Sequence, residues 1–399
     1  MSPPRPVGPS LSVDRLELES GEILTDVRVA YRTWGRLAPG GNNAVLVEHA
    51  LTGSADVDDW WPSLIGEGRA LDPGRDFIVA INALGSCYGT TGPTSLRPGS
   101  GEPWGPEFPK ITVRDMVNLE TRVADALGVE RFAVALGGSL GGMRALEWAV
   151  SYPDRVGSVI ALGAPARHSA WAIGWNAIAR SALLADPKFR DGRYPKDDPP
   201  RAGLAAARAT SMLSYRSFDG LDQRFARSHQ DGRFEVENWL ARHGESFILR
   251  FEANSWLTLS LAMDTHDLGR GRGDLAAVLG ATPVRALLVG ISTDVLYPPR
   301  EVEAVARIWP AAEYLALESS HGHDAFLIEK DAVNRAIAEF RAREPGRGRQ
   351  MTPEAGGPQV GHPGRASPRD AGERLARPAA AAAATSCPSA IPPSLGGTR

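Results

Sequence analysis

The chain has 399 residues, of which 43% are hydrophobic and 23% are charged, and its formal net charge at pH 7 is −3. This length suffices for one large α/β domain with an insertion, and the small net charge gives no electrostatic basis for binding nucleic acid or an anionic membrane. Cys87 and Cys387 are too few for a disulfide framework or a metal site. No apolar run resembles a secretory signal or a membrane span. We therefore expect a soluble, cytoplasmic protein without a metal or cofactor.

The first predicted element is a hairpin, followed by alternating strands and helices. Residues 11–37 alternate between apolar and polar side chains around Ser20-Gly21, as antiparallel strands do. Helical patterns such as 113–127 and 301–308 separate the strands that follow. Apolar strands are predicted near residues 43–48, 76–82, 132–136, 157–162, 285–291 and 313–318. This order predicts an α/β fold with a mostly parallel sheet covered by helices on both faces.

The alternation of strands and helices breaks between about residues 166 and 267. This segment has no clear strand, and helices are predicted at 170–184, 202–213 and 235–243. We interpret it as a helical lid inserted over the carboxyl end of the sheet. The predicted organisation is therefore a core in two parts (1–165 and 271–344), the lid (166–270) and a tail (345–399). The tail is rich in Pro, Gly, Ala and Arg, a composition that cannot build a core, so we expect it to be disordered.

The strand predicted at 132–136 leads directly into a Gly-x-Ser-x-Gly motif centred on Ser139. In α/β-hydrolases such a motif forms a tight turn between a strand and a helix and exposes the serine hydroxyl at the helix start. Gly137 and Gly141 meet the need for small residues where the strand and helix backbones nearly touch. The motif alone is a weak signal, but the apolar strand before it and the amphipathic helix after it favour Ser139 as a nucleophile.

The fold requires an acid and then a histidine on loops that follow later strands. Asp294 lies where the strand predicted at 285–291 ends, and two histidines, His321 and His323, follow the next strand. We choose His323 as the base, because it lies between a flexible glycine and Asp324, which we expect to cap the next helix. In this triad His323 takes the proton of Ser139, and Asp294 fixes the imidazole tautomer and stabilises its charged form.

An attacking serine also needs N–H donors for the oxyanion. The amide after the nucleophile, that of Leu140, is the first predicted donor. The strand predicted at 43–48 ends in a loop whose Leu51 amide is our candidate for the second. His49 begins this loop, and we interpret it as structural, because a polar residue at the end of a buried strand usually satisfies backbone groups.

Seven short motifs follow one another between residues 12 and 342: His49-Ala-Leu-Thr-Gly53, Gly89-Thr-Thr-Gly-Pro93, Gly138-Ser-Leu-Gly-Gly-Met143, Ala145-Leu-Glu-Trp148, Arg250-Phe-Glu-Ala-Asn-Ser255, His266-Asp-Leu-Gly-Arg-Gly271 and Gly322-His-Asp-Ala-Phe-Leu327. Together they resemble the homoserine O-acetyltransferase family. The resemblance implies acetyl transfer from acetyl-CoA, a co-substrate, to the hydroxyl of L-homoserine in methionine biosynthesis, by a homodimer. It carries the triad onto Ser139, Asp294 and His323, and implies substrate contacts at Arg208 and Asp324.

The charges of homoserine explain these two contacts. A zwitterion in a buried site needs a cation for its carboxylate and an anion for its ammonium group, since an unpaired buried charge is costly. Arg208 and Asp324 are candidates for these partners. Three alternatives stay open: transfer to serine, use of succinyl-CoA, and, more distantly, ester hydrolysis. One methylene of acceptor length discriminates only weakly, and an esterase can use the same triad.

Overall fold

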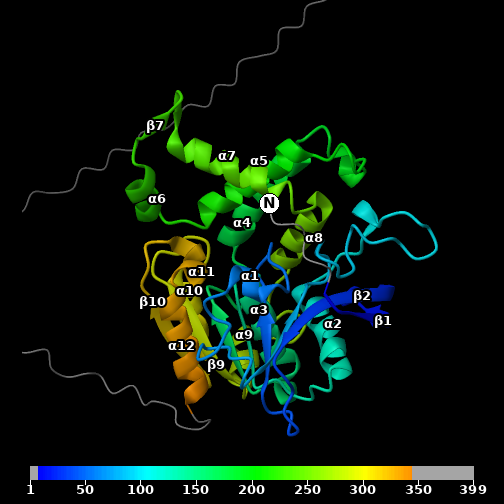
Figure 1. The fold of residues 1–399 in the computed structure, drawn as a ribbon, viewed down its shortest axis with the longest axis vertical. Helices are drawn as coiled ribbons and strands as arrows, with labels where there is room; N and C mark the ends of the chain where they lie inside the picture. The colour runs from blue at the N-terminus through cyan, green and yellow to red at the C-terminus, as the bar shows by residue number, and fades with distance from the viewer. Residues whose placement is uncertain (1–7, 344–399) are drawn as a thin grey trace, which may run out of the picture. The chain divides into compact units, whose positions relative to one another are not determined.

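The structure is a computed structural model that describes residues 8–343. Its centre is an eight-stranded sheet in the spatial order β1-β2-β4-β3-β5-β6-β9-β10 (Figure 1). Strand β2 is antiparallel to both β1 and β4, and all other neighbours are parallel. The strands are β1 (Ser10–Glu17), β2 (Ile23–Trp34), β3 (Ala44–Glu48), β4 (Phe77–Ile81), β5 (Val134–Gly138), β6 (Ser158–Leu162), β9 (Arg285–Ile291) and β10 (Ala312–Leu317).

The central strands are apolar because both faces of the sheet are covered. In β3 every residue is buried, and alternate side chains enter two separate core clusters, Leu46 in one and Val47 in the other. The first cluster receives side chains from α2 (Val113–Ala126), α3 (Leu140–Ser151), α9 (Leu275–Gly280) and α10 (Pro299–Ile308), and also from other helices that lie between β6 and β9. Those of the second are α1 (Val57–Trp60), α11 (Ala325–Ile328) and α12 (Lys330–Ala342). The predicted fold class is confirmed.

The amino-terminal hairpin is present where the alternating pattern predicts it. Strands β1 and β2 pair with Leu16 opposite Leu24, and both side chains are buried. Gly21 in the turn has a φ of +84°, a conformation that glycine adopts without steric cost. The hairpin thereby extends the sheet at one edge.

A group of helices lies between β6 and β9 and forms the upper part of the described chain in Figure 1. It contains α4 (Ala170–Leu184), α5 (Arg201–Ser214), α6 (Phe218–Phe225), α7 (Glu235–Phe247) and α8 (Ala253–Asp264). Helix α5 packs against α4 and α7, and α4 also packs against α8. We call this group the insertion. Helix α4 has the predicted bounds, whereas α6 and α8 were not predicted.

The insertion also contains a short hairpin, β7 (His229–Gln230) and β8 (Arg233–Phe234), where no strand was expected. The expectation was wrong because strands of two residues are too short to show an alternating pattern. Single 3-10 turns complete the elements at Gly105–Glu107, Pro153–Arg155, Arg190–Gly192 and Gly322–Asp324. The exact domain boundaries stay a prediction, and the predicted tail, 345–399, lies outside the described residues.

The parallel strands bring several loops to one edge of the sheet. The loops after β3, β5, β9 and β10 carry Leu51, Ser139, Asp294 and His323. The insertion contacts this edge: Asp324 N–H donates to the Tyr215 carbonyl oxygen (3.2 Å). Carboxyl ends of parallel strands are where open α/β sheets bind ligands.

No helix within residues 8–343 has both the length and the apolar character to cross a membrane.

Candidate active site

Ser139 occupies the sharp turn between β5 and α3, with φ +56° and ψ −125°. A residue other than glycine at positive φ is strained, at a cost of order 1–3 kcal/mol, and persists only when its surroundings hold it. The neighbouring glycines allow the close packing that does so. A Cβ on Gly141 would lie 2.1 Å from the Glu48 carbonyl oxygen, and one on Gly137 would lie 2.6 Å from the same atom. Strand β3, β5 and α3 therefore meet at this turn with no room for side chains.

A buried ion network holds α3 in this position. Arg144 of α3 is fully buried between Glu120 of α2 (Nε to Oε1 2.7 Å) and Glu48 of β3 (Nη2 to Oε2 2.5 Å). Trp148 Nε1 donates to the other oxygen of Glu120 (2.7 Å). Burial raises the pKa of Glu48 well above its ordinary value, although the Arg144 charge opposes the rise. The network connects the helix that follows the nucleophile to the strand that precedes the Leu51 loop.

Asp294 and His323 form a buried pair. His323 Nδ1 donates to Asp294 Oδ2 at 2.7 Å, while Asp294 Oδ1 accepts from the N–H groups of Leu296 (2.8 Å) and Tyr297 (2.9 Å). Burial lowers the pKa of His323, but the charge and hydrogen bond of Asp294 outweigh burial, so that the pKa is raised above 6.5. The pair therefore has the tautomer and the charge stabilisation that a general base requires.

The end of strand β6 connects Ser139 to this pair. The Ser139 N–H donates to the Leu162 carbonyl oxygen (2.9 Å), and the residue after Leu162, Gly163, packs against the pair. A Cβ on Gly163 would lie 3.4 Å from both His323 Cε1 and Asp294 Oδ2. His323 Nε2 is buried and has no hydrogen-bond partner among residues 8–343, Ser139 included. Such bonds are often formed only in the substrate complex, so the free Nε2 remains available to the serine.

The structure brings His323, and not His321, to the acid. The side chain of His321 is 44% exposed, and its Nε2 lies 4.0 Å from Glu329 Oε1. His323 is instead surrounded by three aromatic rings, those of Tyr215 (centroids 5.6 Å apart), Tyr297 (5.1 Å) and Phe326 (5.6 Å). These rings shield the imidazole from water on the sides that do not face Asp294.

The two amides predicted to bind the oxyanion belong to buried residues and are unused. Neither the Leu51 N–H nor the Leu140 N–H donates a hydrogen bond within residues 8–343. Leu51 is 5% exposed and Leu140 is fully buried. Their segments are adjacent, because Glu48 of β3 pairs with Gly137 of β5 and both chains continue past the same edge. Buried N–H groups without partners are rare in proteins and are typical of sites that bind an anion.

Arg208 of α5 is half-buried and stacks on aromatic rings of the insertion. Its guanidinium lies 5.0 Å from the Phe247 ring centroid and 5.8 Å from that of Tyr215. In the part of the chain that the structure describes, no carboxylate pairs with it and no acceptor takes its N–H groups. Burial lowers the pKa of Arg208 from its usual value. A guanidinium fork without a partner at this position is suited to a bidentate carboxylate.

Asp324 lies beside the base, but its carboxylate does not cap a helix as expected. Arg216 Nη2 pairs with Asp324 Oδ2 at 3.0 Å, and Asp324 makes no side-chain capping bond to α11. The prediction of capping was wrong because the insertion brings a cation to this loop, which sequence spacing does not reveal. Burial raises the pKa of Asp324, against the opposite effect of Arg216.

Sequence reasoning assigned no role to several residues of the site. Phe247 supports Arg208, Tyr297 holds Asp294 through its backbone N–H, and Arg250 donates to the Thr52 carbonyl oxygen (2.8 Å) in the Leu51 loop. Only Tyr297 had a local signal, since an aspartate often accepts from the N–H three residues later. The other two come from the insertion and are distant in sequence from the loops they contact.

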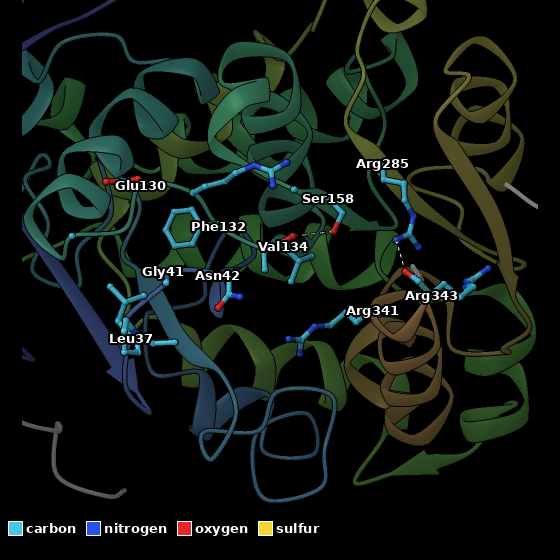
Figure 2. Close-up of a pocket in the computed structure, with 17 residues that line it drawn as sticks. Leu37, Gly41, Asn42, Glu130, Phe132, Val134, Ser158, Arg285, Arg341 and Arg343 are labelled. Carbon is cyan, nitrogen blue, oxygen red and sulfur yellow. Dashed lines mark hydrogen bonds between the residues drawn. The ribbon is translucent and has the colours of Figure 1, made fainter. Parts of the chain in front are cut away.

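A cavity lies at the opposite edge of the sheet, away from the predicted site residues. It has a volume of about 700 Å³ and is lined by residues at the starts of strands, among them Val134, Ser158 and Arg285 (Figure 2). None of the predicted site residues lines it, and its Arg341 is already paired with Asp76 (2.6 Å). Within residues 8–343 no group of three or more His, Cys, Asp or Glu side chains is arranged to hold a metal ion. The chemistry therefore points to the Ser139 edge.

Comparisons with known proteins agree on the fold and the family. The family model of the alpha/beta hydrolase fold matches residues 43–330. A homoserine O-acetyltransferase of Salinibacter ruber is 51% identical over 341 residues, which cover 84% of this chain and 97% of that protein.

Two solved structures are similar in fold. Homoserine O-acetyltransferase from Staphylococcus aureus has 29% identity and a TM-score of 0.71, covering 86% of this chain and 97% of that one. An acetylester hydrolase from Corynebacterium glutamicum has 25% identity and a TM-score of 0.76, covering 84% of this chain and 95% of that one. Because half of the aligned residues are identical to those of a relative that is matched almost from end to end, the chain belongs to the homoserine O-acetyltransferase family, on the α/β-hydrolase fold.

Proposed function

We propose that this protein transfers the acetyl group of acetyl-CoA to the side-chain hydroxyl of L-homoserine, giving O-acetyl-L-homoserine for methionine biosynthesis. The reaction proceeds in two steps through an acetyl ester on Ser139. The observation that carries the proposal is the buried hydrogen bond between His323 Nδ1 and Asp294 Oδ2 beside the Ser139 turn. Membership of the homoserine O-acetyltransferase family supports the choice of donor and acceptor.

In the first step His323 Nε2 takes the proton of Ser139, and Oγ attacks the thioester carbonyl of acetyl-CoA. The amides of Leu51 and Leu140 donate to the oxyanion, as preorganised donors in a water-poor site do. The C–S bond then breaks, and the protonated His323 returns the proton to the leaving thiolate. CoA departs as the free thiol, and the acetyl ester remains on Ser139.

In the second step the acceptor hydroxyl replaces CoA. Arg208 binds the homoserine carboxylate. Asp324, which also forms an ion pair with Arg216, binds the ammonium group. His323 removes the proton of the hydroxyl, which attacks the acetyl ester, and then returns that proton to Ser139 Oγ when the ester breaks. Water can attack the same ester, so the aromatic rings around His323 and the insertion favour transfer over hydrolysis by limiting access of water.

A steady-state assay that crosses two donors with two acceptors tests the proposal. Acetyl-CoA and succinyl-CoA are each combined with L-homoserine and L-serine, and release of the CoA thiol and the product masses are measured. We expect acetyl-CoA with homoserine to give the highest kcat/KM. Ser139→Ala is the control and should release no thiol. A higher kcat/KM with succinyl-CoA or with serine would reject the assigned donor or acceptor.

Acetyl ester hydrolysis is the second candidate, favoured by the structural similarity to the acetylester hydrolase of Corynebacterium glutamicum. The same assay separates the two functions. For a transferase, thiol release depends on the amino acid and stops when it is omitted. For a hydrolase, thiol or alcohol release proceeds at the same rate with and without homoserine.

We further propose that the protein acts as a homodimer, without a cofactor. Helix α4 supports association, because its Trp171, Ile178 and Leu184 are more than half exposed. Static light scattering should give twice the chain mass of 42.6 kDa, and a value equal to one chain would reject the dimer. The cytoplasmic location predicted from the cysteine content stays a prediction.

A further inference from the structure

The loop after β3 holds the second oxyanion donor, and His49 contacts this loop through both ring nitrogens. His49 Nε2 lies 3.0 Å from the Ala83 N–H, and its Nδ1 lies 2.8 Å from the Ala50 carbonyl oxygen. A backbone N–H can only donate, so Nε2 carries the lone pair and Nδ1 carries the proton. The imidazole therefore accepts from Ala83 and donates to Ala50.

This tautomer is the only one that satisfies both contacts. The ring is buried, with 1% of the residue exposed, and burial together with the nearby Arg144 charge lowers the pKa of His49 to about 3. The imidazole is thus neutral at any pH at which the protein works, and it cannot itself serve as the general base, since both of its nitrogens are engaged. This agrees with its interpretation as a structural residue and shows which backbone groups it satisfies.

The bond to Ala50 determines the direction of the next amide. No peptide bond among the described residues is cis, and in a trans peptide the C=O and N–H point in opposite directions. The Ala50 carbonyl oxygen accepts from His49 Nδ1–H and from the Gly53 N–H (2.9 Å), so the plane of the Ala50–Leu51 peptide is fixed from two sides. The Leu51 N–H must then point away from the imidazole, and it has no acceptor within residues 8–343.

Two further contacts hold the same loop. A Cβ on Gly53 would lie 2.9 Å from His49 Cβ, so the glycine makes room for the side chain. From the insertion, Arg250 Nη1 donates to the Thr52 carbonyl oxygen (2.8 Å) and to Tyr88 Oη (2.8 Å). The loop is thus held on both sides of Leu51, by His49 from the sheet and by Arg250 from the insertion.

We propose that His49 is a positioning residue for the oxyanion site: its Nδ1–H holds the Ala50 carbonyl and thereby points the Leu51 N–H at the carbonyl oxygen of the acyl group. The inference rests on the proposed function, because it assumes acyl transfer through Ser139. It assigns separate tasks to the two nitrogens, since only Nδ1 acts on the oxyanion donor, whereas the Nε2 contact with Ala83 stabilises the fold.

Two substitutions separate these tasks. In His49→Asn the side-chain amide NH₂ replaces Nδ1–H, so the bond to Ala50 is kept and the bond to Ala83 is lost. In His49→Gln the side-chain oxygen replaces Nε2, so the bond to Ala83 is kept and the bond to Ala50 is lost. Each variant lacks one buried hydrogen bond, and each is therefore the control for the other's loss of stability.

The measurement is acylation of Ser139 by p-nitrophenyl acetate, which needs neither CoA nor homoserine. We expect His49→Gln to lower the acylation rate constant about 10²-fold, the scale for loss of one oxyanion donor, with little change in KM. His49→Asn should remain within about tenfold of the unsubstituted protein. Methylboronic acid, whose adduct with serine is tetrahedral, should bind more weakly to His49→Gln by a similar factor. Melting temperatures should fall by similar amounts in both variants.

Acylation by His49→Gln within a few-fold of the unsubstituted protein would overturn the proposal, and so would an equal loss in both variants. A measurement on the unsubstituted protein keeps the proposal testable even if the two variants do not fold. In ¹⁵N-histidine spectra of the unsubstituted protein, His49 must show a protonated Nδ1 and a bare Nε2, and the opposite tautomer would reject the inference. Failure to acetylate homoserine while p-nitrophenyl acetate still acylates Ser139 would reject the proposed function alone.

Discussion

His323 differs from His49, which is also buried, in having one nitrogen without a hydrogen-bond partner among the described residues. Both ring nitrogens of His49 form hydrogen bonds with backbone groups. In His323, Nδ1 donates to Asp294, whereas Nε2 has no partner within the described chain. Leaving a buried polar atom unpaired costs stability, by about 1–3 kcal/mol. Such an atom is expected where a substrate or a reacting group completes the set of hydrogen bonds.

The choice between His321 and His323 can be tested by single substitutions. His323→Ala should lower kcat for acetyl transfer by about 10³-fold or more, because the triad depends on one base. His321→Ala should stay within about tenfold, since its side chain is 44% exposed and lies 4.0 Å from Glu329, not beside the acid of the triad. Steady-state kinetics with both purified variants measure the difference. If His321→Ala is the more damaging of the two, the base has been assigned to the wrong histidine.

The pH dependence of acylation follows from the raised pKa of His323. The imidazole acts as a base only when neutral, so the rate should fall as the pH drops through a value above 6.5. Asp294 raises this pKa, and its replacement in Asp294→Asn should therefore move the remaining titration to lower pH, as well as slow the reaction. Rates of p-nitrophenyl acetate acylation between pH 5 and about 9 measure both curves. An inflection in the variant at the same or a higher pH would contradict the role of Asp294.

At the scale of elements, the site depends on how closely α3 approaches β3. Gly141→Ala would place a Cβ 2.1 Å from the Glu48 carbonyl oxygen, and a backbone atom cannot easily move aside. We expect a loss of about 3 kcal/mol or more in the free energy of unfolding, at the upper end of overpacking costs, together with loss of activity.

Gly174→Ala is the matched control for this prediction. Gly174 lies within α4, and a Cβ there would meet no atom within 4 Å. Alanine favours a helix over glycine by about 0.5–1 kcal/mol, so this variant should be as stable as the unsubstituted protein or more so. Chemical denaturation of both variants gives the comparison. Equal stability of the two variants would mean that the backbone around Ser139 can move to accommodate the added Cβ, contrary to the short distance to the Glu48 carbonyl oxygen.

The insertion supplies Arg208, the group proposed to bind the carboxylate of the acceptor. Arg208→Ala should lower kcat/KM for homoserine by about ten- to a hundredfold, because a hydrogen bond to a charged group contributes about 1.5–3 kcal/mol. Acetylation of Ser139 by acetyl-CoA should persist, since this step needs no carboxylate partner. Arg208→Lys should recover only part of the loss, because a point charge does not reproduce the guanidinium fork.

Separate measurement of the two half-reactions checks this prediction. Unchanged homoserine kinetics in Arg208→Ala would assign the carboxylate to another residue. Equal damage to both half-reactions would indicate that the variant disturbs the packing of α5 on Phe247, and not acceptor binding.

At the scale of the whole molecule, the segment 345–399 is rich in Pro, Gly, Ala and Arg, a composition that cannot build a core. The Salinibacter ruber relative is matched over 97% of its length by 84% of this chain, so part of this chain has no counterpart in that relative. A chain that ends near residue 344 should therefore keep its melting temperature and turnover within experimental error. Differential scanning fluorimetry and the acetyl transfer assay measure both. A large decrease in either would assign the segment 345–399 a role in folding or assembly.

The sequence by itself determined the elements whose signals are local. Strands such as β6 and β9 are continuous apolar runs because both faces of a parallel sheet are covered, and the glycines around Ser139 mark the turn between β5 and α3. The order of nucleophile, acid and histidine along the chain is likewise a sequence property. Helix α8 was missed because it is buried on nearly all sides and so lacks an amphipathic period.

Only the tertiary structure decided which groups pair across long sequence separations. The bonds of Asp324 to Arg216, of His49 to Ala83 and of Arg250 to Thr52 each join segments from different elements. Their partners cannot be inferred from spacing, because a side chain bonds to whatever the fold brings within about 3 Å. The same holds for the Leu51 and Leu140 amides. A local motif can predict which N–H group is the donor. Whether an acceptor within the protein reaches that group depends on how all neighbouring segments pack.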